Sequence, residues 1–370
     1  MNGLESEGLT RRNFLKIGGA GIAGLTGVAG LHRISAGEAA AAPPHQEHQQ
    51  EHDEHAQMTV GQVDHQRNGF HPLDLLYDFD YGTVTEENGR TVREWNIVAV
   101  DQEVEIAPGV YFPAWVYGSP TSAASRKQGR VVGQVPGPTL RCVEGELLRI
   151  HFANASLHPH TLHFHGIHSA RMDGAPGIGR GMIGPGESFT YEFDAEPFGL
   201  HLYHCHVFPL ARHIAKGLYG TFIVDPQGGW PPVDHEYVMV MNGIDVDFDD
   251  ENDFYAVNTI PFHYQLHPIP IKVGETVRIF LVNLLEFDPI NSFHLHANFF
   301  HYYPTGTSLE PSEYTDTIMQ AQAQRGILEF AYKYPGLFMF HAHKTEFAEL
   351  GWTGNFEVTV AEGAGDGDAE

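Results

Sequence analysis

The chain is poor in cysteine and in basic residues. It has 370 residues with 2 cysteines, and 21 Lys and Arg stand against 47 Asp and Glu, which gives a formal net charge of −26. Two cysteines exclude a disulfide framework, and a chain of this length can bury self-sufficient cores without one. The acidic excess disfavours nucleic acid and anionic membrane surfaces as partners. Solubility or a salty habitat would produce the same excess.

The sequence also lacks a convincing membrane span. An apolar run at residues 17–31 is short for a spanning helix and rich in glycine. It follows Arg11-Arg12 and precedes an Ala-rich stretch, Ala39–Ala42, that suits cleavage. This order predicts a twin-arginine export signal over residues 1–42, and therefore a periplasmic, cell-surface or extracellular protein. A membrane anchor is the alternative.

Two further segments are polar. Residues 43–89 begin with a histidine-rich tract that composition alone leaves open as a solvated linker, which we favour, or as a metal-scavenging arm. Its histidines are His45, His48, His52, His55 and His65. Residues 362–370 form an acidic, Gly-rich tail that we expect to be disordered.

Histidines, in contrast, are placed in a repeated pattern. Gly199–His206 and Gly336–His343 share the pattern Gly-Leu-x-x-aromatic-His-x-His, and only the first copy surrounds a cysteine, Cys205. Another His-x-His pair precedes each copy. Imidazole suits copper, zinc, iron and nickel, whereas one thiolate with two imidazoles and a weak axial neighbour is the blue-copper ligand set. The pattern predicts a copper redox protein.

The repeat extends beyond the histidines. Val143–Asn154 matches Val273–Asn283, and Gly217–Val224 matches Gly351–Val358. Such a fixed correspondence indicates a duplicated domain. We place the two domains at residues 90–226 and 235–361, with a linker at 227–234.

The segments between turns have the character of strands. Leu147–Phe152 and Val277–Val282 are short, rich in β-branched and aromatic residues, and bounded by Gly, Pro or Asn. Their regular spacing predicts an all-β protein with a Greek-key β-sandwich in each half. Because residues i and i+2 of a strand share a face, Cys205 should point away from His204 and His206. Two metal sites can then share one strand.

A mononuclear site can be completed in the first half. His160, Cys205 and His213 supply two imidazoles and a thiolate, and Leu218 falls where an axial ligand would come. This constellation, with His160-Thr161-Leu162-His163-Phe164-His165-Gly166, resembles the His-x-x-His-x-His-Gly motif of the multicopper oxidases. The resemblance covers nearly all of residues 90–360. It implies two tandem cupredoxin-like domains with a type 1 copper in the first, made more oxidising by the axial leucine.

The second half keeps the paired histidines but not the mononuclear ligands. The positions that align with His160, Cys205, His213 and Leu218 are Asn291, Ala342, Phe347 and Trp352. The second domain is therefore expected to contribute half of a shared cluster.

The resemblance implies that this cluster is a trinuclear copper site. Carried over residue by residue, His163 and His294 would hold the type 2 copper. The type 3 pair would be held by His165, His204, His206, His296, His341 and His343. With the type 1 copper, this ligand count implies about four coppers per chain.

A proton donor is also expected, because reduction of dioxygen to water consumes protons. Met172-Asp173-Gly174 resembles the Asp-Gly element that follows the first His-x-His-Gly in this family, which makes Asp173 the candidate. An ordinary Asp-Gly turn is the alternative.

Three functions compete. An oxidase would pass electrons from a small-molecule or metal-ion donor to dioxygen. A copper nitrite reductase would produce nitric oxide. The third class, an electron carrier, would not explain eight paired histidines. The stretch from Cys205 to Leu218 resembles the longer loop of nitrite reductases, but that family carries an aspartate at the position of His163 and a non-ligand at that of His206. The oxidase is favoured and nitrite reductase is the alternative.

The resemblance also bears on assembly. In two-domain oxidases the first domain of one subunit faces the second domain of the next, and such heterologous contacts close into a homotrimer. The sequence does not indicate which donor is oxidised.

Overall fold

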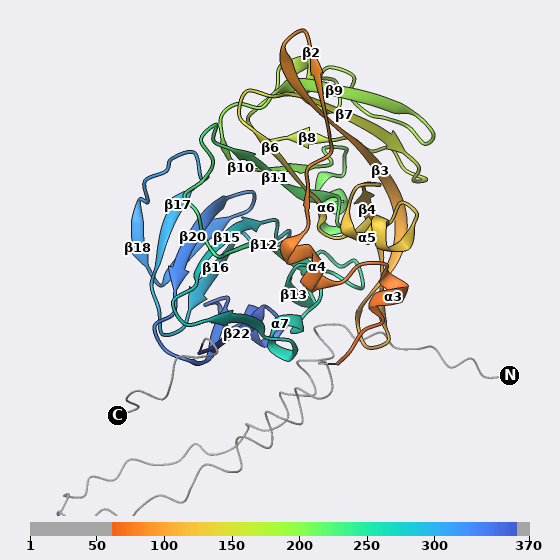
Figure 1. Ribbon diagram of the computed structural model, residues 1–370. Helices are drawn as coiled ribbons and strands as arrows, with labels where there is room; N and C mark the ends of the chain where they lie inside the picture. The colour runs from red at the N-terminus through yellow and green to blue at the C-terminus, as the bar shows by residue number, and fades with distance from the viewer. Residues whose placement is uncertain (1–60, 361–370) are drawn as a thin grey trace, which may run out of the picture.

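The computed structural model describes residues 61–360 (Figure 1). The expected export signal, the histidine-rich tract up to residue 60 and the acidic tail lie outside the described residues. Within residues 61–360 no helix is both long and apolar enough to cross a membrane.

The first domain consists of two packed sheets. One has the order β1 (Phe79–Asp80), β6 (Gly137–Val143), β11 (Tyr219–Asp225), β10 (Gly199–His204) and β8 (His163–Phe164). The other has the order β5 (Gly133–Gln134), β4 (Val110–Gly118), β3 (Arg90–Ala107), β7 (Leu147–Asn154) and β9 (Ser188–Asp194), with β2 (Thr83–Glu87) paired to β3. Short helices lie between the strands: α5 (Ala123–Gln128), α6 (Leu210–Ala215) and the 3-10 turn η2 (Ala170–Met172).

The second domain repeats this arrangement. One sheet has the order β13 (Phe254–Val257), β12 (His235–Ile244), β15 (Thr276–Asn283), β20 (Arg325–Ala331), β17 (Phe300–Pro304) and β18 (Glu313–Thr315). The other has the order β14 (Ile269–Lys272), β22 (Thr353–Thr359), β21 (Gly336–His341), β16 (Ile290–Leu295) and β19 (Thr317–Ala321). The helices are α7 (His263–Leu266) and α8 (Thr345–Glu349). The predicted all-β fold with two tandem sandwiches is confirmed.

Each sandwich has its own core. In β7, Leu148, Ile150 and Phe152 are buried between the sheets, and they alternate with residues that are less buried. This is the period-two pattern of a strand with one covered face. The corresponding strand β15 is buried on both faces, because Phe280 and Val282 belong to a further core between the domains.

The interdomain core fixes how the two domains meet. Leu200 and Leu202 of β10 are completely buried in it. The amide of Leu200 donates to the carbonyl of Thr305 over 2.8 Å, and the guanidinium of Arg325 donates to the carbonyl of Leu200 over 2.8 Å. The strand that carries the first histidine repeat is therefore held directly by the second domain.

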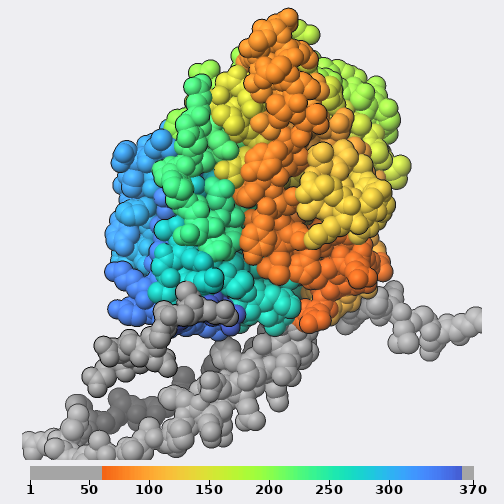
Figure 2. Space-filling view, viewed as in Figure 1, coloured from red at the N-terminus to blue at the C-terminus, as the bar shows by residue number. Residues whose placement is uncertain are grey.

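The stretch from residue 61 to residue 89 is the described part of the expected polar N-terminal segment, and it is folded. It forms α3 (His65–Asn68), α4 (Pro72–Tyr77), β1 and β2, and Figure 2 shows it in orange along one face of the molecule. Phe70 and Leu75 enter the interdomain core, and Leu76 enters the core of the second domain. The composition of this segment is polar overall, and it does not predict that three apolar side chains are sufficient to anchor two helical turns.

Candidate metal centres

The expected mononuclear ligands converge in the first domain. Sγ of Cys205 lies 3.2 Å from Nδ1 of His213 and 3.9 Å from Nδ1 of His160, and the two imidazole nitrogens are 3.3 Å apart. Cys205 follows β10, His213 lies on α6, and His160 pairs with Ile183 in an isolated bridge. One thiol and two imidazoles, all buried, thus face one point.

The protonation states in this group suit a metal. Burial lowers the pKa of His160 to about 3 and that of His213 to about 4, so both imidazoles are neutral near pH 7. Nε2 of His160 bonds to the hydroxyl of Ser156 over 2.9 Å, which leaves Nδ1 to face the sulfur. Burial raises the pKa of the Cys205 thiol, so a thiolate needs a nearby cation.

Leu218 takes the expected place beside these groups. Its carbonyl accepts from the amide of Cys205 over 2.9 Å, and its amide donates to the carbonyl of His213 over 3.2 Å. The side chain is completely buried and has no donor atom. It therefore contributes an apolar wall.

Four imidazoles gather beside β10 and β8. The ring of His163 lies 5.0 to 5.3 Å from those of His165, His204 and His206. Nδ1 of His163 donates to the carbonyl of Asp173 over 2.7 Å, and Nδ1 of His204 donates to the carbonyl of Cys205 over 2.8 Å. Because a carbonyl only accepts, Nε2 of each ring keeps its lone pair for a metal.

The second domain repeats this group in detail. The ring of His294 lies 5.0 to 5.4 Å from those of His296, His341 and His343. Nδ1 of His294 donates to the carbonyl of Asp316 over 3.0 Å, and Nδ1 of His341 donates to that of Ala342 over 2.7 Å. The duplication thus preserved the hydrogen bonds that orient the rings as well as the histidines.

Both groups can accommodate metal ions. Nε2 of His165 lies 2.9 Å from Nε2 of His204, and the same distance separates the Nε2 atoms of His296 and His341. Two nitrogens bound to one ion at about 2.0 Å would lie at such a separation. Nδ1 of His206 is also buried without a partner.

Within the described residues, the two histidine groups are separate. Among residues 61–360, ring contacts link the members of each group, and none joins a ring of one group to a ring of the other. A site that uses all eight imidazoles needs the two groups to be brought together.

Asp173 forms the turn that its sequence allowed, and its carboxylate lies near a candidate metal ligand. Its Oδ1 accepts from the amide of Ala175 over 3.2 Å, as in a turn, and lies 3.7 Å from Nδ1 of His163. His168 joins these two residues in a further possible metal-ligating group. Sequence spacing gave no reason to select His168, because it lies outside both His-x-His pairs.

The second domain has no equivalent of the mononuclear site among its described residues. Ala342, Phe347 and Trp352 are completely buried, and the ring of Phe347 stacks on Tyr255 at 3.9 Å. Apolar packing fills the space that the thiol and imidazoles occupy in the first domain.

Trp115, which sequence reasoning missed, covers the mononuclear group. Its ring lies 4.5 Å from that of His158 and 4.8 Å from that of His213. It lines a cavity of about 410 Å³ together with Asp101, Glu103, His158 and Lys216, among others. A lone tryptophan in a strand carries no signal that distinguishes this position from core packing.

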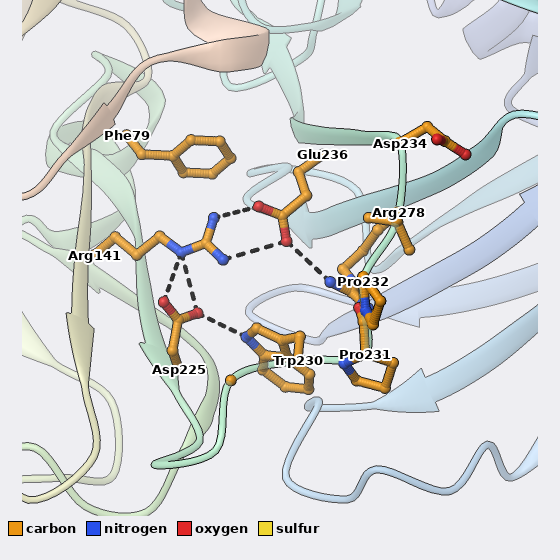
Figure 3. Close-up of a pocket in the computed structure, with 11 residues that line it drawn as sticks. Phe79, Arg141, Asp225, Trp230, Pro231, Pro232, Asp234, Glu236 and Arg278 are labelled. Atoms are coloured by element: carbon orange, nitrogen blue, oxygen red, sulfur yellow. Dashed lines mark hydrogen bonds and ion pairs between the residues drawn. The ribbon is translucent and has the colours of Figure 1, made fainter.

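A larger cavity of about 470 Å³ lies away from the histidines, at the domain junction (Figure 3). Arg141 contacts Asp225 and Glu236, and Arg278 contacts Glu236. Because these buried charges neutralise one another, the cavity is a structural ion-pair network and not a site prepared for a charged substrate.

Comparisons with known proteins agree with the donor sets. Residues 115–229 and 235–362 each match the family described as multicopper oxidase. A solved multicopper oxidase is 62% identical, with a TM-score of 0.75, and the match covers 80% of this chain and 100% of that one. The fold is accordingly cupredoxin-like.

More distant relatives include both of the expected enzyme classes. A copper-containing nitrite reductase from Neisseria meningitidis is 28% identical over 288 residues, which is 71% of this chain and 68% of the relative. An L-ascorbate oxidase from Brassica rapa is 38% identical over 110 residues, 28% of this chain and 19% of the relative.

Proposed function

Because the chain belongs to the multicopper oxidase family, a family of copper-binding oxidoreductases, we propose that it couples one-electron oxidation of a reducing substrate to four-electron reduction of dioxygen to water. The observation that carries this proposal is the pair of matching histidine groups. Eight imidazoles in two matching groups exceed what an electron carrier or a single catalytic copper requires.

The ligand assignment follows from the two kinds of group. His160, Cys205 and His213 would hold a type 1 copper, with the side chain of Leu218 beside them as an apolar neighbour. His163 and His294 would hold a type 2 copper. The type 3 pair would be held by His165, His204, His206, His296, His341 and His343. The expected content is about four coppers per chain.

The residues around these sites have distinct tasks. When bound, copper supplies reversible one-electron chemistry at the first site and reduction of dioxygen at the second. Cys205 is joined through the backbone to His204 and His206, which gives a short covalent route between the two. Leu218 excludes water from the thiolate, and the Asp173 carboxylate would hold the protons that dioxygen reduction consumes.

A homotrimer would complete the shared site, and the repeat supports this. Leu200 and Leu202 of β10 are buried by the second domain, whereas the corresponding Leu337 and Met339 of β21 are 62% and 37% exposed. Conversely, β15 is buried on both faces and its counterpart β7 on only one. Each chain therefore has two incompletely buried faces, one on β21 and one on β7, whose counterparts in the other domain are buried. A closed head-to-tail ring requires two such faces on each chain.

The reducing substrate would approach beside Trp115. Trp115, whose ring lies 4.8 Å from that of His213, lines a cavity of about 410 Å³, and the size of this cavity suits a small molecule or a metal ion. Export by the twin-arginine pathway, to the periplasm, the cell surface or the medium, remains part of the proposal because Arg11-Arg12 precedes a short apolar run.

Reduction of nitrite to nitric oxide is the alternative, favoured by the 28% identity to a nitrite reductase over most of the chain.

The stoichiometry of oxygen uptake tests the oxidase proposal. Copper-loaded protein should consume one dioxygen for every four donor electrons and release water without peroxide. Without oxygen, it should form little nitric oxide from nitrite. Abundant nitric oxide with negligible oxygen uptake would overturn the oxidase proposal.

A further inference from the structure

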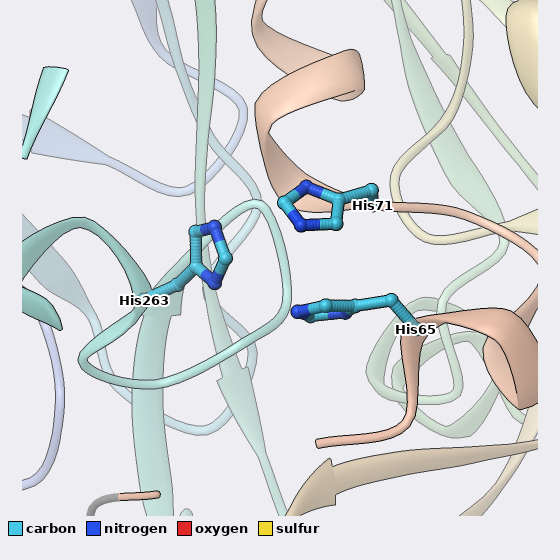
Figure 4. A group of neighbouring side chains, drawn as sticks. All are labelled: His65, His71 and His263. Atoms are coloured by element: carbon cyan, nitrogen blue, oxygen red, sulfur yellow. The ribbon is translucent and has the colours of Figure 1, made fainter. Parts of the chain in front are cut away.

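Three histidines outside both candidate centres converge at the edge of the second domain (Figure 4). His65 begins α3, His71 precedes α4, and His263 begins α7. The ring of His71 lies 4.2 Å from that of His65 and 5.1 Å from that of His263. One nitrogen from each imidazole lies within 4.8 Å of the others.

Two of these rings leave buried nitrogens without partners. Nδ1 of His65 and Nε2 of His263 are buried, and neither makes a hydrogen bond. Buried polar atoms are nearly always paired, so an unpaired nitrogen on two adjoining rings calls for a ligand. Burial lowers the pKa of His65 to about 4 and that of His263 to about 2, which keeps both rings neutral.

From this geometry we propose that His65, His71 and His263 form a further metal site for a divalent ion of the zinc or copper type. Three neutral imidazoles are a ligand set that both ions accept. His267, whose ring lies 4.8 Å from that of His263, stands next to the site and offers a fourth imidazole. Carboxylates near the cluster are already engaged: Asp64 caps α3, Asp74 pairs with Lys127, and Glu105 accepts from the amides of Asp64 and Gly109.

Binding has one local cost. The amide of Leu73 donates to Nδ1 of His71 over 3.1 Å at the start of α4. A metal bound to Nδ1 of this ring would occupy the lone pair that accepts this bond. A metal bound to Nε2 would leave the proton on Nδ1, which could then no longer accept. One helix-capping bond is exchanged for a metal bond.

The site would act as a clamp between distant parts of the chain. His65 and His71 belong to the stretch that precedes the first domain, whereas His263 belongs to the second domain. One hydrogen bond already joins these parts, from the hydroxyl of Tyr264 to the carbonyl of Pro72 over 2.9 Å. An ion bound only in the folded state would stabilise this contact.

Zinc binding to copper-loaded, full-length protein tests the proposal. The wild type, His71→Gln, His263→Gln and His151→Gln are equilibrated with Zn²⁺, passed through a desalting column and analysed for zinc and copper. His151 is a matched control on β7 that lies outside the cluster and bonds to Thr190. The wild type and His151→Gln should retain one metal ion more than the two cluster variants, with zinc and copper counted together, and all four should have equal blue absorbance.

Zinc held elsewhere contributes equally to the wild type and to each variant, so it cancels in the difference between their metal contents. This includes any zinc bound by His45, His48, His52 or His55. Zinc should also raise the melting temperature of the wild type and leave that of His71→Gln unchanged. If His263→Gln does not fold, the half-buried His71 variant still decides the result. Equal totals of zinc and copper in the wild type and His71→Gln would overturn the proposal, as would loss of the extra ion in His151→Gln.

Discussion

Nδ1 of His163 lies 2.7 Å from the carbonyl oxygen of Asp173, and Oδ1 of the same aspartate lies 3.7 Å from that nitrogen. The main chain of Asp173 therefore orients the imidazole, while its side chain places a carboxylate beside it. Substitution of the side chain separates these two roles.

Asp173→Asn should lower the rate of dioxygen reduction and preserve copper content. The carbonyl that orients His163 remains, and only the proton-carrying group is lost. A positioned acid or base contributes about 10²-fold or more to a rate, so we expect a loss of that order in kcat. Oxygen uptake at saturating donor, with copper measured in the same sample, checks this.

Asp316→Asn is the matched control. The carbonyl of Asp316 orients His294 in the same way, but its carboxylate accepts from the hydroxyl of Thr317 over 3.0 Å. This variant should retain most of its activity. Equal losses in both variants would show that the Asp173 carboxylate has no special role.

Cys205→Ser should abolish the intense blue absorption and lower the copper content by about one per chain, because a hydroxyl does not replace the thiolate. Cys142→Ser changes the other buried cysteine, whose thiol faces the carbonyl of Ile223 at 3.7 Å. That variant should stay blue. Absorption spectra and copper analysis of both proteins decide the assignment, which a blue Cys205→Ser protein would refute.

Leu337→Lys should dissociate the proposed trimer. A charge on this 62% exposed leucine would have to be buried at the subunit contact, which disfavours association strongly. Sedimentation should show monomers that keep the blue absorption and lose oxygen uptake. Leu266→Lys, at a 44% exposed leucine of α7, is the control and should remain trimeric and active.

The copper-free protein should lose stability as the pH falls from about 7 toward 4. Burial lowers the pKa of His160 and His165 to about 3 and that of His201 to about 4, from an ordinary value of 6.5. The unfolded chain binds protons on these rings first, so their contribution is complete above pH 6.5 and is lost as the pH falls through the lowered values.

Urea unfolding at several pH values measures this effect. Copper keeps its ligand imidazoles unprotonated only in the folded state, while the unfolded chain still takes up protons, so the copper-loaded protein should depend on pH at least as steeply over the same range. A flat profile for the copper-free protein would contradict the burial of these rings.

The sequence predicted the elements whose spacing is set by covalent geometry. In His204-Cys205-His206, alternation along a strand was enough to separate the thiol from the imidazoles, and the structure places them accordingly. The alignment of the two halves also indicated that Phe347 and Trp352 of the second domain stand at the positions of His213 and Leu218.

Contacts between segments far apart in the sequence could not be foreseen. His263 meets His65 and His71 only because two short helices dock on the second domain, and no periodic pattern marks that docking. Trp115 covers His213 for a similar reason, since strand β4 and helix α6 are brought together by tertiary packing alone. The docking of residues 61–89 likewise depends on Phe70, Leu75 and Leu76, which the polar composition of the segment does not single out.

The exposure of β21 has a practical consequence for dilute samples. The mononuclear group, which includes Cys205, lies entirely within one chain. The proposed oxygen-reducing site, which uses all eight paired imidazoles, needs surfaces from two chains. Colour and turnover should then respond differently to concentration: a sample diluted below the association threshold would remain blue and lose its activity, and concentrating it again would restore turnover without added copper.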